Sequence, residues 1–294
     1  MPAAQTHASS PEVEAFFHAP TFTVTYLVWD RETKDGAVID SVFDFDAKSG
    51  RSGAHSAQAV LDAAKAKGVR IGLILETHAH ADHLSAAPFL KKATGARIGI
   101  GAKITTVQEV FKKVFNLTDL TPDGRPFDLL LEDGARIPLG SLDIEIIATP
   151  GHTPACVSYK IGDAVFVGDT LFMPDYGTAR ADFPGGDART LYRSVQRILS
   201  LPAETRLFMC HDYKAPGRDV FLWESTVAEE RARNEHVRQG VSEDEFVAMR
   251  EARDKTLEMP VLIVPSIQVN IRAGELPTPE ANGVRYLKVP IDAL

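Results

Sequence analysis

The spacing of apolar and polar residues predicts strands and helices in alternation. Residues 21–29 alternate threonine with larger side chains, as a strand does, and the segment GAVID at 36–40 is predicted to be its hairpin partner. Residues 56–68 place alanine, valine and leucine at helical spacing and end at Gly68, a residue favoured just past a helix. This order of elements indicates a layered α/β protein.

Four short apolar runs are predicted to be buried strands: 71–75, 142–149, 164–169 and 206–210. They are rich in β-branched or aromatic residues, although runs of this length do not exclude buried helix. Each ends in, or is closely followed by, a histidine or an aspartate. Residues 187–199 carry one apolar helical face, with Asp187 placed as the N-cap.

The segment after residue 218 differs in composition from the rest. Residues 223–240 and 242–255 are predicted to be helical, and Ser242 and Glu245 have the spacing of a capping box. The last forty residues are expected to be strand and irregular chain folding back on the main body. We therefore predict an N-terminal extension (1–19), a core (20–218) and a C-terminal part (219–294), all within one integrated domain.

Composition excludes several classes of function. The chain has 294 residues, 44% of them hydrophobic, and a formal net charge of −8 without a stripe of lysine and arginine, so nucleic acid is not an expected partner. No apolar stretch approaches the ~20 residues of a membrane helix, and the start resembles neither a signal peptide nor a transit peptide. Two cysteines suit a reducing compartment, so we expect a cytoplasmic protein.

The segment ETHAHADHLS at 76–85 carries the most specific chemistry. It offers imidazole and carboxylate ligands, which suit Zn, Fe, Mn or Ni, at the edge between a strand and a helix where ligands bind in open α/β folds. Three other strand ends supply matching groups. The candidate metal-binding residues are His78, His80, Asp82, His83, His152, Asp169 and His211.

An H-x-H-x-D-H motif followed by separate His, Asp and His residues resembles the metallo-β-lactamase superfamily. The resemblance implies an αββα sandwich, in which two mixed β-sheets lie face to face with helices outside. It also implies two metal pockets that Asp169 would bridge. One would be formed by His78, His80 and His152, and the other by Asp82, His83 and His211.

Further segments resemble the persulfide dioxygenase branch of that superfamily. They are R-x-D-F at 180–183, T-L-Y-x-S-V at 190–195, HDY at 211–213, STVAEERARN at 225–234 and an N-x-R-x-G loop at 270–274. Residues 102–128 look like an insertion and residues 174–177 lengthen the approach to Arg180, so the substrate entrance is expected to differ. Ala273 stands where some members have cysteine, and no role of that thiol carries over.

The branch implies one Fe(II) per chain, held by His78, His152 and Asp169. Such a set of two histidines and one carboxylate leaves positions open for substrates. His80, Asp82, His83 and His211 would then hydrogen-bond water and the ligand imidazoles from outside the ligand set. Arg180 and Asp182 are expected to form an ion pair beside Asp169.

The reaction that the branch implies takes glutathione persulfide and O2 to sulfite and glutathione. Glutathione has two carboxylates and one ammonium, so its site should offer arginine, lysine or tyrosine. Tyr176, Lys214, Arg218 and Arg272 are the candidates, chosen because they lie near the motifs. An ordinary surface charge is an equal alternative for each of them.

Two other interpretations stay open. All seven ligand positions also fit a glyoxalase II-like hydrolase that splits a glutathione thioester between two metals. A module that binds a metal or a thiol without catalysis is the third possibility. The sequence leaves open the persulfide carrier, whether the chain forms a homodimer, and whether zinc replaces iron.

Overall fold

Strand β2 (Thr23–Trp29) shows how the first sheet is covered, because all of its residues are buried. In the computed structural model, which describes residues 10–292, Val24, Tyr26 and Val28 face a second sheet. Leu27 and Trp29 point the other way, toward helices. Since side chains alternate along a strand, this strand lies between a sheet on one face and helices on the other.

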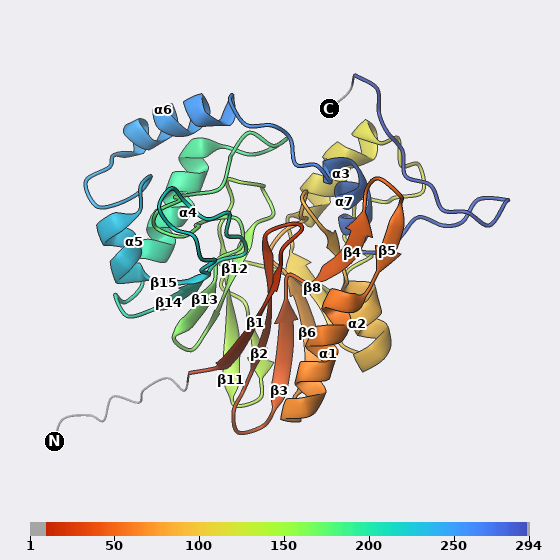
Figure 1. Ribbon diagram of the computed structural model, residues 1–294, viewed down its shortest axis with the longest axis horizontal. Coiled ribbons are helices and arrows are strands. Elements are labelled where there is room, and N and C mark those ends of the chain that lie inside the picture. The colour runs from red at the N-terminus through yellow and green to blue at the C-terminus, as the bar shows by residue number, and fades with distance from the viewer. Residues whose placement is uncertain (1–9, 293–294) are drawn as a thin grey trace.

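Two mixed sheets of six strands each form the body of the molecule (Figure 1). The first has the order β1 (Glu12–His18), β2, β3 (Asp35–Ile39), β6 (Arg70–Glu76), β8 (Arg97–Gly101), β9 (Leu129–Leu131). The second has the order β10 (Arg136–Leu139), β11 (Leu142–Ala148), β12 (Val157–Ile161), β13 (Ala164–Phe166), β14 (Arg206–Phe208), β15 (Glu224–Thr226). A small third sheet joins β5 (Arg51–Gly53), β4 (Val42–Asp46) and β7 (Leu84–Ser85).

Helices cover the outer face of each large sheet (Figure 1). On the first sheet lie α1 (His55–Lys67), α2 (Ala87–Thr94), α3 (Ile104–Val114) and α7 (Ile263–Asn270). On the second lie α4 (Ala188–Leu199), α5 (Val227–Arg233) and α6 (Glu243–Asp254). The structure therefore confirms the αββα sandwich that the sequence resemblance implied.

Several local predictions are confirmed as well. The run 71–75 lies within β6, and the other three runs contain β11, β13 and β14. Gly68 ends α1 in the left-handed conformation, with φ 69°. The Asp187 side chain accepts a hydrogen bond from the Thr190 backbone N–H at the start of α4, and Ser242 and Glu245 form the capping box of α6.

The structure corrects the prediction for the two ends of the chain. The sheet begins at β1, inside the predicted extension, because Val13, Ala15 and Phe17 pack on the core between the sheets. At the other end, residues 255–292 contain helix α7 and no strand. Pro265 lies in the first turn of α7, where the backbone N–H groups have no partner within the helix, so proline is tolerated there. The division at residues 19 and 218 stays a prediction.

Among the described residues, no helix combines the length and the apolar character needed to cross a membrane.

Candidate metal centre

The candidate metal-binding residues lie in four loops at one end of the sandwich. The loop between β6 and β7 contributes the histidines of the 76–85 segment, and His152 lies in the turn between β11 and β12. Asp169 follows β13, and His211 follows β14. Each of these histidines is at most 3% exposed. Both large sheets therefore contribute groups to one buried site.

His78, His152 and Asp169 form one group, whose candidate ligand atoms lie within 4.8 Å of one another. The Asp169 Oδ2 atom is 4.0 Å from His78 Nε2 and 3.7 Å from His152 Nε2. Two imidazole nitrogens and a carboxylate oxygen at this spacing surround a position that a cation can occupy.

A backbone carbonyl fixes the tautomer of His152. His152 Nδ1 lies 2.8 Å from the Arg180 carbonyl oxygen. A carbonyl oxygen only accepts hydrogen bonds, so Nδ1 carries the proton and donates it. The Nε2 atom of the neutral ring is then left with its lone pair facing Asp169.

A hydroxyl group does the same for His78. Thr77 Oγ1 donates to Asp40 Oδ2 at 2.9 Å and lies 3.0 Å from His78 Nδ1. Since the hydroxyl proton goes to the carboxylate, the hydroxyl oxygen accepts from His78 Nδ1–H, and His78 Nε2 keeps its lone pair. Burial lowers the pKa of His78 well below its ordinary value, so this ring is neutral at neutral pH.

The second group consists of His80, Asp82, His83 and His211. His211 Nε2 is 3.4 Å from Asp82 Oδ2 and also 3.4 Å from Asp169 Oδ1. Asp169 thus offers one carboxylate oxygen to each group. Burial lowers the pKa of His83 to about 4, so its ring is also neutral.

Buried polar atoms that have no hydrogen-bond partner among residues 10–292 test whether the site fits a metal. They include the Nε2 atoms of His78, His83 and His211 and the Oδ1 atom of Asp169. Buried nitrogen and oxygen atoms without partners are destabilising unless something else satisfies them. Of these nitrogens, those of His78 and His211 lie within 4.0 Å of Asp169, which fits a bound cation. The donor set of imidazole and carboxylate suits iron or zinc.

Asp40 and Glu76 hold His80 from outside the cluster, and motif spacing identifies neither as a site residue. His80 Nε2 lies 3.0 Å from Asp40 Oδ1 and 3.3 Å from Glu76 Oε2, and all three side chains are buried. Burial by itself lowers the pKa of His80, but the two carboxylates outweigh it and raise that pKa well above its ordinary value. His80 differs in this respect from His78 and His83.

Asn270 anchors the histidine-rich loop to the C-terminal part. Its Nδ2 atom donates to the carbonyl oxygens of His80 and His83 at 2.8 and 2.7 Å, and its Oδ1 accepts from the Ser85 N–H at 2.8 Å. The N-x-R-x-G segment, noted in the sequence only as a family feature, therefore fixes the backbone of this loop.

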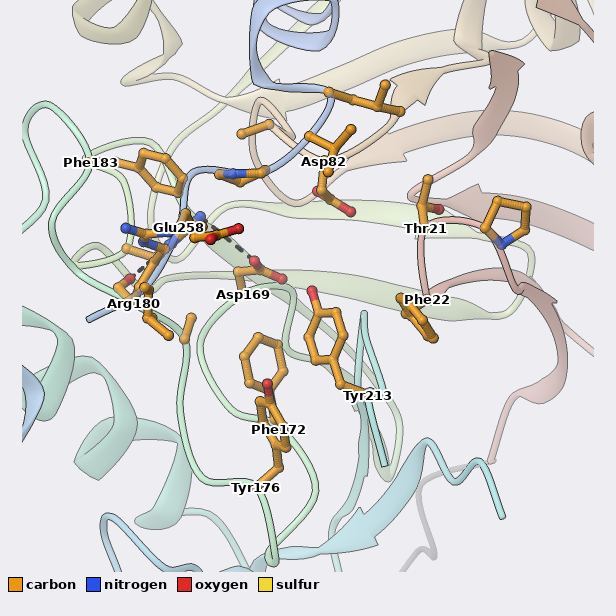
Figure 2. A pocket seen from close by; sticks show the side chains of 18 of the residues that line it. Thr21, Phe22, Asp82, Asp169, Phe172, Tyr176, Arg180, Phe183, Tyr213 and Glu258 are labelled. Carbon is orange, nitrogen blue, oxygen red and sulfur yellow. Dashed lines mark hydrogen bonds and ion pairs between the residues drawn. The ribbon is translucent and has the colours of Figure 1, made fainter. Parts of the chain in front are cut away.

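A cavity of about 560 Å³ opens onto the first group, with His152, Asp169 and Asp82 in its wall. Figure 2 shows Tyr213 with its hydroxyl end pointing toward Asp169. The Tyr213 ring stacks on His211, with 5.7 Å between centroids. Six aromatic side chains line the cavity: Phe22, Phe45, Phe172, Tyr176, Phe183 and Tyr213.

Of the four residues predicted to contact the substrate, only one lines the cavity. Tyr176 lines the cavity, whereas Lys214, Arg218 and Arg272 do not. Each of these three cations faces a carboxylate elsewhere: Lys214 meets Asp219, Arg218 meets Asp175 and Asp212, and Arg272 meets Asp119.

Arg180 and Asp182 lie beside the site. Two Arg180 nitrogens donate to the two oxygens of Asp182 at 2.6 and 2.7 Å, and only Arg180 of the pair lines the cavity. Residues 102–128 contribute nothing to the cavity wall. In that segment, Gln108 donates to the Ile271 carbonyl oxygen, so the segment packs beneath the C-terminal part.

Comparison with known proteins adds a family. Residues 18–211 match the family model described as the metallo-beta-lactamase superfamily. A probable metallo-hydrolase of Burkholderia pseudomallei is 56% identical, over 96% of this chain and 99% of that protein. Glyoxylase B2 of Dictyostelium discoideum is 46% identical, over 98% and 99%.

The human mitochondrial persulfide dioxygenase ETHE1 is 32% identical, over 90% of this chain and 89% of that protein. Among solved structures, ETHE1 from Myxococcus xanthus superposes with a TM-score of 0.72 and 28% identity, over 90% of this chain and all of that one.

Proposed function

Because the chain belongs to the metallo-β-lactamase superfamily, in the branch that includes the persulfide dioxygenases, we propose that it is a persulfide dioxygenase with one Fe(II) per chain. Its substrates would be glutathione persulfide and O2. With one water molecule they give glutathione, sulfite and two protons, a step of sulfide oxidation. We also propose that it works in the cytoplasm, because both of its cysteines are free and buried.

The observation that carries the proposal is that His78, His152 and Asp169 gather without His80. Two imidazoles and one carboxylate are the ligand set of non-haem Fe(II) oxygenases. A bound Fe(II) would supply open coordination positions for both substrates and would relay electrons from the persulfide sulfur, which is oxidised, to dioxygen. The Arg180 carbonyl and Thr77 hold the two imidazoles in the tautomer that such binding requires.

The protein's other groups would act on the substrate from around the ligands. The aromatic wall excludes water from the reacting sulfur, and the Tyr213 hydroxyl is directed toward Asp169, where it can donate a hydrogen bond to a bound oxygen or sulfur (Figure 2). His211 lies where it can hydrogen-bond water next to Asp169, and the His83 ring lies 6.3 Å from the His211 ring. The cavity holds both substrates side by side, which lowers the entropic barrier to their reaction.

A two-metal thioester hydrolase of the glyoxalase II kind is the second candidate. The group of His80, Asp82, His83 and His211, with its unpartnered nitrogens, favours it. The names of the Burkholderia and Dictyostelium relatives point the same way. Two metals, held by the two groups of residues, would activate a water molecule for attack on the thioester carbonyl.

Metal content and oxygen uptake separate the two candidates. We expect anaerobically iron-loaded protein to hold one iron per chain and to consume O2 with glutathione persulfide, releasing sulfite. The substitution His152→Ala should lower the rate at least about a hundredfold, because it removes a ligand, and His211→Ala should lower it less. Two metals per chain, with thioester cleavage and no persulfide-dependent O2 uptake, would overturn the proposal in favour of the hydrolase.

A further inference from the structure

The cavity has few positive charges free to meet a substrate. Of the cations in its wall, Arg180 is engaged by Asp182 and by the Glu258 carbonyl oxygen. Arg250 is 1% exposed and donates to Asp254 and to the Thr178 carbonyl oxygen. Neither guanidinium is available to bind an anion without losing these partners.

Arg253 is in a different position. It lines the same cavity from the last turn of α6, is exposed, and its side chain makes no hydrogen bond or ion pair with any residue from 10 to 292. Its guanidinium lies 5.9 Å from the centre of the Tyr176 ring. Contact with an aromatic face restrains a guanidinium and leaves its N–H groups free to bind in the ring plane.

Lys48 is the remaining cation of the cavity wall, and its side chain is less restrained than that of Arg253. It lies in the turn between β4 and β5, is exposed, and contacts no aromatic ring among the described residues. A flexible lysine on a turn loses more side-chain entropy on binding than a restrained arginine does. Arg253 is therefore the stronger candidate for an anion contact.

We propose that Arg253 binds a carboxylate of the substrate and thereby selects persulfides that carry one. The inference rests on the proposed function for the identity of the substrate. A guanidinium meets a carboxylate through two parallel charge-assisted hydrogen bonds, and the apolar wall next to it strengthens them. The sulfur of such a substrate would then lie beside His152 and Asp169, which line the same cavity.

Calorimetry with S-methylglutathione tests the contact apart from turnover, because this thioether has no outer sulfur to oxidise. We expect Arg253→Gln to weaken its binding at least about tenfold, and Arg253→Lys to weaken it less. Lys255→Gln is the matched control, since it removes an exposed charge from the end of the same helix but outside the cavity. Its affinity should stay at that of the unsubstituted protein, and all variants should keep the melting temperature.

Two modified ligands identify the carboxylate. The first ligand is S-methylglutathione with its glycine carboxylate converted to an amide. The second has its glutamyl α-carboxylate converted to an amide instead. The ligand that lacks the partner of Arg253 should bind the unsubstituted protein and Arg253→Gln equally, while the other ligand keeps the difference. Equal binding of S-methylglutathione by both proteins overturns the proposal. So does a full difference with both amides, or no binding to the unsubstituted protein.

Failure of this proposal and failure of the proposed function give different results. If binding depends on Arg253 but no O2 is consumed, the contact stands and the dioxygenase assignment fails. If O2 is consumed with a KM for persulfide that Arg253→Gln leaves unchanged, the dioxygenase assignment stands and the contact fails.

Discussion

At the scale of single residues, His78 and His152 are prepared for metal binding by unrelated partners. The Thr77 hydroxyl orients the His78 ring and a backbone carbonyl orients the His152 ring, so that both Nε2 atoms face Asp169. The seven candidate ligands follow from motif spacing, because histidine and aspartate at strand ends of one fold converge. Asp40 and Arg253 could not be found this way, since each comes from a segment whose own spacing carries no signal. Tyr213 lies in the HDY segment, but the resemblance gave that residue no role.

The cations predicted to contact the substrate show that proximity in the sequence does not establish a contact. Lys214 and Arg218 were chosen because they follow His211 closely in the sequence. A neighbour in sequence need not point the same way, and both side chains turn to nearby carboxylates instead. A prediction from proximity therefore needs the fold before it can select contacts.

Glu230 gives a prediction on pH and stability. It is fully buried on α5, its Oε2 accepts from Asn234 at 2.7 Å, and its Oε1 has no partner among the described residues. Burial raises the pKa of Glu230 from its ordinary value of 4.5 to about 8. Between these values the folded protein holds a proton that the unfolded chain has lost, so this residue's contribution to stability falls as pH rises.

The substitution Glu230→Gln is neutral at every pH and should remove that loss. We expect the variant and the unsubstituted protein to have the same free energy of unfolding near pH 5. As pH rises toward 9, the variant should become the more stable of the two, by about 1.4 kcal/mol per pH unit between the two pKa values. Melting temperatures across this range measure the difference. Glu229→Gln, at a side chain that is 42% exposed, is the control and should show a much weaker trend. A constant difference at all pH values would contradict the expectation.

At the scale of elements, the sequence predicts half of the strands in the two large sheets and several of the helices, but not the role of the C-terminal segment. Periodicity and capping residues identify α1, α4 and α6, because those signals are local. Helix α7 is short and apolar, and nothing local separates it from a strand. Its identity depends on packing against β7 and on the contacts of its last residue, Asn270.

Asn270→Ala tests that role of α7. The change removes three hydrogen bonds to the backbone of the histidine-rich loop, and we expect a loss of about 3 kcal/mol in the free energy of unfolding. Metal affinity should fall as well, because the loop carries His78. Urea unfolding and competition with a chelator measure the two effects. Asn282→Ala, at an exposed residue of the tail, should change neither.

At the scale of the whole molecule, the metal centre lies where the two sheets meet. His78 belongs to a loop of the first sheet, and His152 and Asp169 to loops of the second. Gly168 shows how closely the sheets approach there, because a Cβ atom at this residue would lie 2.5 Å from Thr77 Oγ1. The overall fold follows from the motif set by family resemblance, whereas this close approach follows only from three-dimensional packing.

Metal removal should therefore lower the stability of the folded protein, because the site joins loops from both sheets. A ligand that binds only the folded state stabilises it, by about 2.7 kcal/mol at a hundredfold excess over its Kd. We expect chelation to lower the melting temperature by roughly 5 °C or more. Differential scanning calorimetry with and without chelator measures the change. The His152→Ala protein should respond much less, and an equal response would mean that the stabilising metal lies elsewhere.

Burial of the two cysteines determines whether their thiols would react with a persulfide substrate of the proposed kind. Burial raises the pKa of Cys156 to about 12 and that of Cys210 well above its ordinary value. Persulfides transfer sulfur to thiolates, and a protonated thiol without access to solvent does not compete for them. Cys156 lies only four residues from His152, yet it would stay unmodified through many turnovers. Neither thiol would therefore be available to a persulfide substrate of the proposed kind.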